Sequence, residues 1–75
     1  MMQLRADEIW TRDSEVAIQV QGRCSYRVTF QEGEAHVLAP GLDRRVEVDW
    51  EVYPEEDLEA AAMILIAQLE GGLEL

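Results

Sequence analysis

Four stretches of this chain alternate apolar and polar residues with a period of two, and this pattern constrains the fold more than any other feature. Neighbouring side chains of a β-strand point to opposite faces, so such a stretch predicts a strand with one buried and one solvated face. The stretches cover residues 16–21, 24–31, 35–39 and 46–52. Together they predict an antiparallel sheet with one apolar face.

The turns between these strands can be tested against the same pattern, because facing residues of an antiparallel pair lie on one side of the sheet. A two-residue turn at Glu32 and Gly33 sets Phe30 opposite Ala35, and the two apolar faces then coincide. Between the first two stretches an odd-length loop is required. A three-residue loop over 21–23 sets Val20 opposite Cys24.

A second glycine-containing turn precedes the last strand. Pro40 and Gly41 fit the two central positions of a type II turn. This turn is predicted to begin a connection that runs as far as Arg45, before a final strand over residues 46–52.

After Pro54 the spacing of apolar residues changes to that of a helix. Acidic residues at 55–59 suit the positive end of a helix dipole, and Gly71 and Gly72 form a C-terminal stop. A helix over residues 55–70 is therefore predicted. The residues expected to face the sheet are Leu58, Ala62, Leu65 and Leu69.

The N-terminal segment, residues 1–13, has no clear period. It fits either a strand around residues 9–11 that turns at Asp13 and Ser14, or a short helix over 6–10, and we favour the strand. The fold class is then α+β: an antiparallel meander of three to four strands with one C-terminal helix packed on its apolar face. A chain of 75 residues is expected to form a single domain with a small core. The expected core residues are Val16, Ile18, Val20, Tyr26, Val28, Phe30, Val37, Val46, Val48, Trp50, Leu58, Ala62, Leu65 and Leu69.

Composition excludes several classes of function. Hydrophobic residues make up 48% of the chain, so it is not a disordered acidic tail, and the net charge of -10 argues against direct binding to nucleic acid or to anionic membranes. The longest apolar run, residues 60–67, is far shorter than the roughly 20 residues of a membrane span. The lone Cys24 and the lack of an apolar leader segment favour a cytoplasmic location.

Neither an enzyme nor a metal centre is indicated by the residues that carry chemistry. The only histidine, His36, is expected on the solvated face opposite Thr29, whereas Cys24 is expected on the apolar face, so the two cannot form a catalytic pair. His36 could meet Glu34 and Glu47 in a metal site, but a solvated polar face explains these residues better. We therefore expect no enzymatic activity, no cofactor and no metal.

The distribution of charge is the most informative signal about function. Residues 1–46 contain seven acids and all six arginines, for a net charge of -1, whereas residues 47–75 contain nine acids and no base, for a net charge of -9. On a strand, acids two positions apart would form a row with a spacing of roughly 6.6 Å. Such a row could imitate nucleic-acid phosphates, or it could be a solvated surface with helix-capping acids. The candidate partner-binding residues are Glu47, Asp49, Glu51, Glu55, Glu56 and Glu59.

The helix carries more apolar surface than one sheet can cover. Met63, Ile64 and Ile66 lie partly off the stripe that should face the sheet, and residues 60–67 offer no polar outer face. We therefore predict a homodimer interface at Met63, Ile64 and Ile66, since dimerisation enlarges the core of a small protein. The alternative is that residues 4–10 wrap over the helix.

These features favour a non-enzymatic, acidic protein-binding module. It would act as an inhibitor or neutraliser that covers a basic, nucleic-acid-binding surface of a protein partner. In size and charge it is analogous to the small acidic inhibitors that phages and mobile elements direct against host defence nucleases. The alternative function is a structural or assembly subunit that homodimerises through its C-terminal helix.

Overall fold

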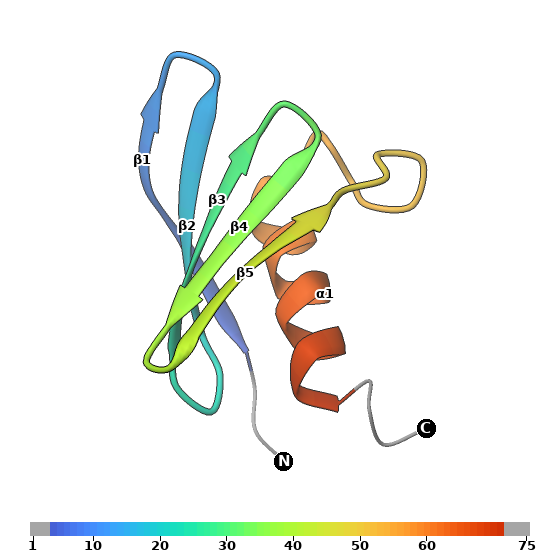
Figure 1. Cartoon of the computed structure of the whole chain (residues 1–75). Helices are drawn as coiled ribbons and strands as arrows, with labels where there is room; N and C mark the ends of the chain where they lie inside the picture. Colours follow the sequence, from blue (N-terminus) through green and yellow to red (C-terminus); the bar gives the residue numbers. More distant parts are fainter. Residues whose placement is uncertain (1–3, 72–75) are drawn as a thin grey trace.

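In the computed structural model, which describes residues 4–71, the chain forms a five-stranded antiparallel sheet followed by one helix (Figure 1). Each strand pairs with the next along the chain, in the order β1-β2-β3-β4-β5, so the α+β meander is confirmed with five strands rather than three or four. The elements are β1 Arg5–Arg12, β2 Glu15–Gln21, β3 Ser25–Gln31, β4 Glu34–Ala39, β5 Leu42–Glu47 and α1 Leu58–Gly71.

The N-terminal segment forms a full edge strand, which confirms the preferred interpretation and extends it. β1 pairs with β2 through a bulge at Ile9, so that Glu8 faces Ile18 whereas Trp10 faces Ala17. A bulge inserts one extra residue and shifts the following side chains to the other face of the sheet. The alternation of β1 is therefore broken at its centre, which explains why the sequence pattern was ambiguous there.

The turn at Glu32 and Gly33 has the predicted register, with Phe30 opposite Ala35. Both turn residues have positive φ angles, 42° and 82°, which are the angles that a two-residue hairpin with the right-handed twist of the strands requires. The β2–β3 loop has an odd length, as predicted, but it consists of residues 22–24, and Val20 faces Tyr26 rather than Cys24. A shift of two residues leaves every side chain on the predicted face.

A final strand is present, but its predicted bounds, residues 46–52, are wrong, because β5 spans Leu42–Glu47. Pro40 and Gly41 alone form the turn, so Leu42 already pairs with Ala39 and β5 begins there. The ladder ends where Glu47 faces Glu34, the first residue of β4. Val48 N–H donates one further backbone hydrogen bond, to the carbonyl of Gly33 in the β3–β4 turn, at 2.8 Å. After Val48 the chain has no neighbouring strand among residues 4–71 to pair with, because β4 begins at Glu34. Residues 48–57 therefore form a loop.

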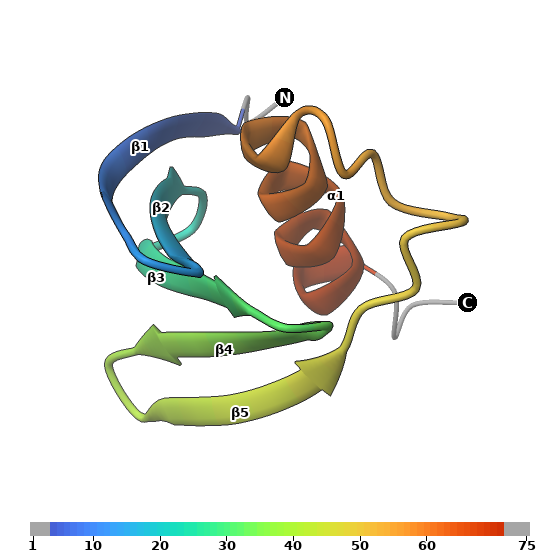
Figure 2. The ribbon, with the colours of Figure 1, turned by 90° about the horizontal axis from the view of Figure 1, so that it is seen from above.

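The helix begins at Leu58 rather than Glu55, and it ends at Gly71. Gly72, the second residue of the predicted stop, lies outside the described residues. Seen from above, the sheet curls, and α1 lies on its concave side (Figure 2). The helix packs most closely against β1 and β2. Between residues 4 and 71 no helix is long and apolar enough to cross a membrane.

The core lies between the curled sheet and α1. The loop that follows β5 completes it, because Val48, Trp50 and Tyr53 pack against the core from residues that are not part of the sheet. Val52, which the strand prediction placed on the same face, is 68% exposed. The fully or nearly fully buried members are Ile18, Val20, Tyr26, Val28, Phe30, Ala35, Val37, Ala61, Ala62, Leu65 and Ile66.

Placing Ile66 at a dimer interface is wrong, because its side chain is fully buried within the monomer. The curled sheet surrounds more of the helix than a flat sheet would, so Leu65 and Ile66 both face the core. Ile64, in contrast, is 38% exposed and Met63 is half-buried. The N-terminal alternative is not observed at Trp10, because residues 5–12 pair with β2 at the sheet edge and Trp10 faces Ala17, away from the helix, although β1 packs against α1 and Leu4 and Ala67 line one depression.

Two isoleucines two positions apart on α1 provide a matched test of this packing. We expect Ile66→Ala to lower the free energy of unfolding by about 2–5 kcal/mol, because it leaves a cavity in the core. Ile64→Ala should change it by about 0.5 kcal/mol or less, because that side chain faces outward. Urea denaturation followed by circular dichroism measures both, and equal losses would contradict this orientation of the helix.

Candidate functional site

Five acidic residues lie close together where the helix begins beside β1. Acidic side chains of the preceding loop, the first helical turn and β1 surround one open depression of about 340 Å³, with Ile18 and Leu58 at its base. We call this group the acidic surface. Its members are Glu8, Glu55, Glu56, Asp57 and Glu59.

Two of these acids have a clear role in local folding. The Asp57 side chain accepts a hydrogen bond from Ala60 N–H at 3.1 Å, and its carbonyl accepts one from Ala61 N–H at 3.0 Å, so Asp57 caps the helix. The Glu59 carboxylate accepts a hydrogen bond from Glu8 N–H at 3.0 Å and ties α1 to the edge strand. Glu55 and Glu56 are exposed and have no such role.

No arginine neutralises the acidic surface: among residues 4–71, no guanidinium group pairs with any of its five carboxylates. The registers of the five strands place four of the six arginines, Arg5, Arg12, Arg27 and Arg45, on the face of the sheet turned away from the helix. Acids and arginines are interspersed on that face, as on ordinary protein surfaces. The acidic surface therefore keeps its field, which attracts positively charged molecules.

The structure brings together only part of the predicted row of acids. Glu55, Glu56 and Glu59 belong to the acidic surface, whereas Glu47 lies on the opposite sheet face beside Glu34, its partner in β4. The row is therefore wrong as a strand feature, because the strand ends at Glu47.

Asp49 and Glu51 lie in the loop rather than in a strand. The Asp49 carboxylate accepts a hydrogen bond from Glu51 N–H at 2.9 Å, and the Asp49 carbonyl accepts bonds from Val52 and Tyr53 N–H groups. Asp49 thus shapes the loop. Glu8, which sequence reasoning missed, joins the acidic surface only because β1 lies next to α1.

A groove at the other side of the same loop combines aromatic and acidic groups. It has a volume of about 400 Å³, and Glu55 and Leu58 line both this groove and the acidic surface. Trp50 packs on Phe30, with ring centroids 5.8 Å apart and planes tilted by 47°. Glu32, in the β3–β4 turn, supplies a second carboxylate.

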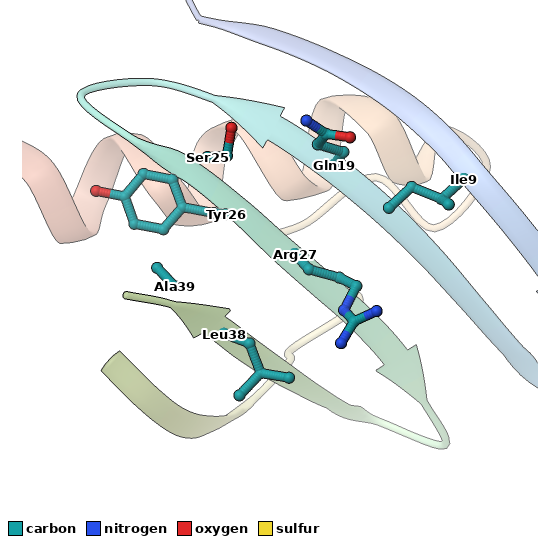
Figure 3. A pocket seen from close by; sticks show the side chains of 7 residues that line it. All are labelled: Ile9, Gln19, Ser25, Tyr26, Arg27, Leu38 and Ala39. Atoms are coloured by element: carbon teal, nitrogen blue, oxygen red, sulfur yellow. The ribbon is translucent and has the colours of Figure 1, made fainter. Parts of the chain in front are cut away.

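The face of the sheet turned away from the helix has a shallow pocket of about 410 Å³ (Figure 3). Arg27 lies between Gln19 and Leu38, its neighbours on β2 and β4, and Ile9 lies at the side of β1. The pocket offers the guanidinium group of Arg27, the amide of Gln19, the hydroxyl of Ser25 and apolar walls. Arg27 is the one cation among residues 4–71 that lines it, so its charge is weak.

His36 lies opposite Thr29 on this outer face, as predicted, and its Nε2 is 2.6 Å from Asp43 Oδ1. Cys24, which lies in the β2–β3 loop, packs against the core instead. Glu34 and Glu47 are near His36 in the register, yet no three His, Cys, Asp or Glu side chains between residues 4 and 71 are arranged to hold a metal ion.

The end of α1 is fastened to the β2–β3 loop by Glu70. Its Oε2 accepts hydrogen bonds from Tyr26 O–H at 2.8 Å and from Arg23 N–H at 2.7 Å. A Cβ atom on Gly22 would lie 2.6 Å from the same oxygen, so glycine permits this approach. Burial, the bond to Glu70 and a bond to the Cys24 thiol all raise the pKa of Tyr26 well above its ordinary value.

Comparison of the chain with models of protein families, with curated proteins and with solved structures found no match. The function of this protein is therefore inferred from its own residues.

The Tyr26–Glu70 contact predicts a loss of stability in alkali. Because the pKa of Tyr26 is raised in the folded state, the free energy of unfolding should hold up to pH ~10, where an unfolded tyrosine ionises, and fall as pH rises further. Tyr26→Phe should be less stable near neutral pH but lose this extra decline. Denaturant unfolding between pH 8 and 11 measures both, with Tyr53→Phe as the control that keeps the decline.

Proposed function

We propose that this protein is a non-enzymatic binding module whose acidic surface covers a basic, nucleic-acid-binding surface of a protein partner. The observation that carries the proposal is the group of five carboxylates around one depression, with no guanidinium paired to them among residues 4–71. A field of one sign accelerates encounter with a partner of the opposite sign, and salt weakens that effect.

The chemistry of the partner follows from this charge. A surface that normally holds phosphates carries arginine and lysine side chains, and carboxylates are the groups that proteins have for occupying such sites. Direct binding to nucleic acid and to anionic membranes is disfavoured by the net charge of -10. Bound in this way, the protein would act as an inhibitor or neutraliser of its partner.

Reversal of two exposed acids tests the proposal. Glu55→Lys with Glu56→Lys changes the net charge from -10 to -6, because each substitution adds two positive charges. The double variant should lose a basic partner that the native protein captures from a host extract at low salt. With the purified partner, we expect affinity to fall about tenfold or more.

A control pair separates local from overall charge. Asp7→Lys with Glu34→Lys produces the same net charge, but both residues are exposed on the opposite face of the sheet. This variant should keep the partner, and duplex DNA or RNA should displace the partner from the native protein. If both double variants bind equally, or if nucleic acid does not compete, the proposal is wrong.

A second candidate function is an assembly subunit that homodimerises through α1. It is favoured by the outward stripe of the helix, which has no charge over about two turns and includes the 38% exposed Ile64. The stripe consists of Ala60, Met63, Ile64 and Ala67, all exposed or half-buried. Dimerisation would cover it without involving the acidic surface.

Sedimentation equilibrium at two concentrations tests this second candidate. The native protein should show a mass that rises towards twice 8.5 kDa, and Ile64→Glu should remain monomeric. Val52→Glu is the control, because Val52 is the more exposed side chain but lies in the loop, and this variant should still dimerise. A native protein that stays monomeric at both concentrations rules out the helix interface.

A further inference from the structure

The groove beside Trp50 has walls of two different kinds. Its floor is the side chain of Phe30, which is only 4% exposed, and its apolar sides come from Val16, Trp50 and Leu58, which are half-buried. Its rim carries the exposed carboxylates of Glu32 and Glu55, which belong to different turns of the chain. No arginine or histidine of the described part of the chain lines it.

This combination suits a long side chain with an apolar stem and a cationic, planar head. The stem can lie along Val16 and Leu58, while the head meets the Trp50 ring and the two carboxylates. Arginine fits better than lysine, because its guanidinium group stacks on aromatic faces, is more weakly hydrated, and matches a carboxylate with two parallel hydrogen bonds.

We infer that the Trp50 groove binds one arginine side chain of the basic partner, with Glu32 and Glu55 as its counter-charges. This inference rests on the proposed function, whose acidic surface adjoins the groove through Glu55 and Leu58. The acidic surface attracts the partner over a distance, and the groove selects an arginine at short range.

The size and charge of the groove argue against other occupants. A volume of about 400 Å³ lies near the lower end of the ~300–1,000 Å³ range of ligand pockets, which suits one side chain rather than a cofactor. Two carboxylates and no cation in the lining disfavour an anion. A wholly apolar side chain would bury the rim without satisfying its charges.

The same molecule already contains a contact of this type. On the opposite face of the sheet, the Arg12 guanidinium lies 5.3 Å from the centre of the Trp10 ring. Trp10 thus has its own arginine, whereas the Trp50 groove is lined by two carboxylates and by no cation among residues 4–71. The two tryptophans are the only ones in the chain, so Trp10 provides an internal reference for any probe of Trp50.

Titration of the ¹⁵N-labelled full chain with N-acetylarginine amide tests the inference. The indole N–H signal of Trp50 and the amide signals of Glu32 and Gly33 should shift together and saturate, while the Trp10 indole stays unchanged. N-acetylcitrulline amide has nearly the same shape but no charge, and it should cause no saturable shift. Equal shifts with both probes, or arginine-dependent shifts that leave Trp50 unaffected, would overturn the inference.

Two variants and one control locate the interaction. Glu32→Gln, a conservative change at an exposed turn, should weaken binding of the arginine probe by about two- to fivefold, the usual range for an exposed ion pair. Trp50→Leu should abolish the saturable shift of the Glu32 and Gly33 amides. Glu56→Gln lies outside the groove and should bind as the native protein does. Native affinity in Glu32→Gln and Trp50→Leu would refute the assignment.

The proposed function of the acidic surface and the proposed arginine site in the groove can be refuted separately. If Glu55→Lys with Glu56→Lys loses the partner but Glu32→Gln and Trp50→Leu keep full affinity for it, the proposed function stands and the groove is not an arginine site. If the arginine probe saturates at Trp50 but no basic partner depends on Glu55 and Glu56, the groove is correct and the proposed function is wrong.

Discussion

The length of β4 is the constraint on which the rest of the structure depends. Two tight turns, at Glu32 and Gly33 and at Pro40 and Gly41, leave β4 only the six residues between Glu34 and Ala39. β5 can pair only along that length, so its ladder ends at Glu47 and the chain must leave the sheet. The ten residues that follow, 48–57, cross to the start of α1, and they carry five acids and no base. A local feature of two hairpins thus decides where the charge of the molecule is presented.

The same loop has a second role, because a helix of 14 residues that lies against β1 and β2 leaves part of the apolar face of the sheet uncovered. Val48, Trp50 and Tyr53 pack there, and the Tyr53 O–H donates a hydrogen bond to the side chain of Gln68 at 2.8 Å. The loop is therefore held from both sides, by the Phe30–Trp50 contact and by the helix. This fixation matters for binding, because carboxylates on a fastened loop lose less conformational entropy when a partner docks.

Charge divides the molecule into two unlike faces. The outer face of the sheet mixes arginines with acids, and one arginine already stacks on Trp10. The acidic surface and the neighbouring groove at the helix start are lined by carboxylates and by no arginine or histidine among residues 4–71, together with a half-buried tryptophan. Aromatic groups beside uncompensated carboxylates are suited to recognise arginine, and this arrangement links the acidic surface to a specific contact rather than to general attraction.

Sequence alone determined the antiparallel meander, the C-terminal helix, the Glu32 and Gly33 turn and most of the core, because these depend on the local periods of apolar residues and on turn chemistry. The sequence prediction failed over residues 42–45, which it assigned to a connection although they belong to β5. Three of these four residues are charged: Arg44 lies on the face of the sheet towards the helix, and Asp43 and Arg45 lie on the outer face. With charged residues on both faces, this edge strand lacks the alternation of apolar and polar residues that predicts a strand. The prediction also assigned residues 48–52 to a strand, because Val48 and Trp50 face the core from a loop with the same alternation. Only the tertiary structure decided that Ile66 is buried while Ile64 is not, and that Glu8 joins Glu55, Glu56 and Glu59. Both outcomes depend on how the sheet curls around the helix and brings β1 and α1, from opposite ends of the chain, into contact, which no local pattern of the sequence shows.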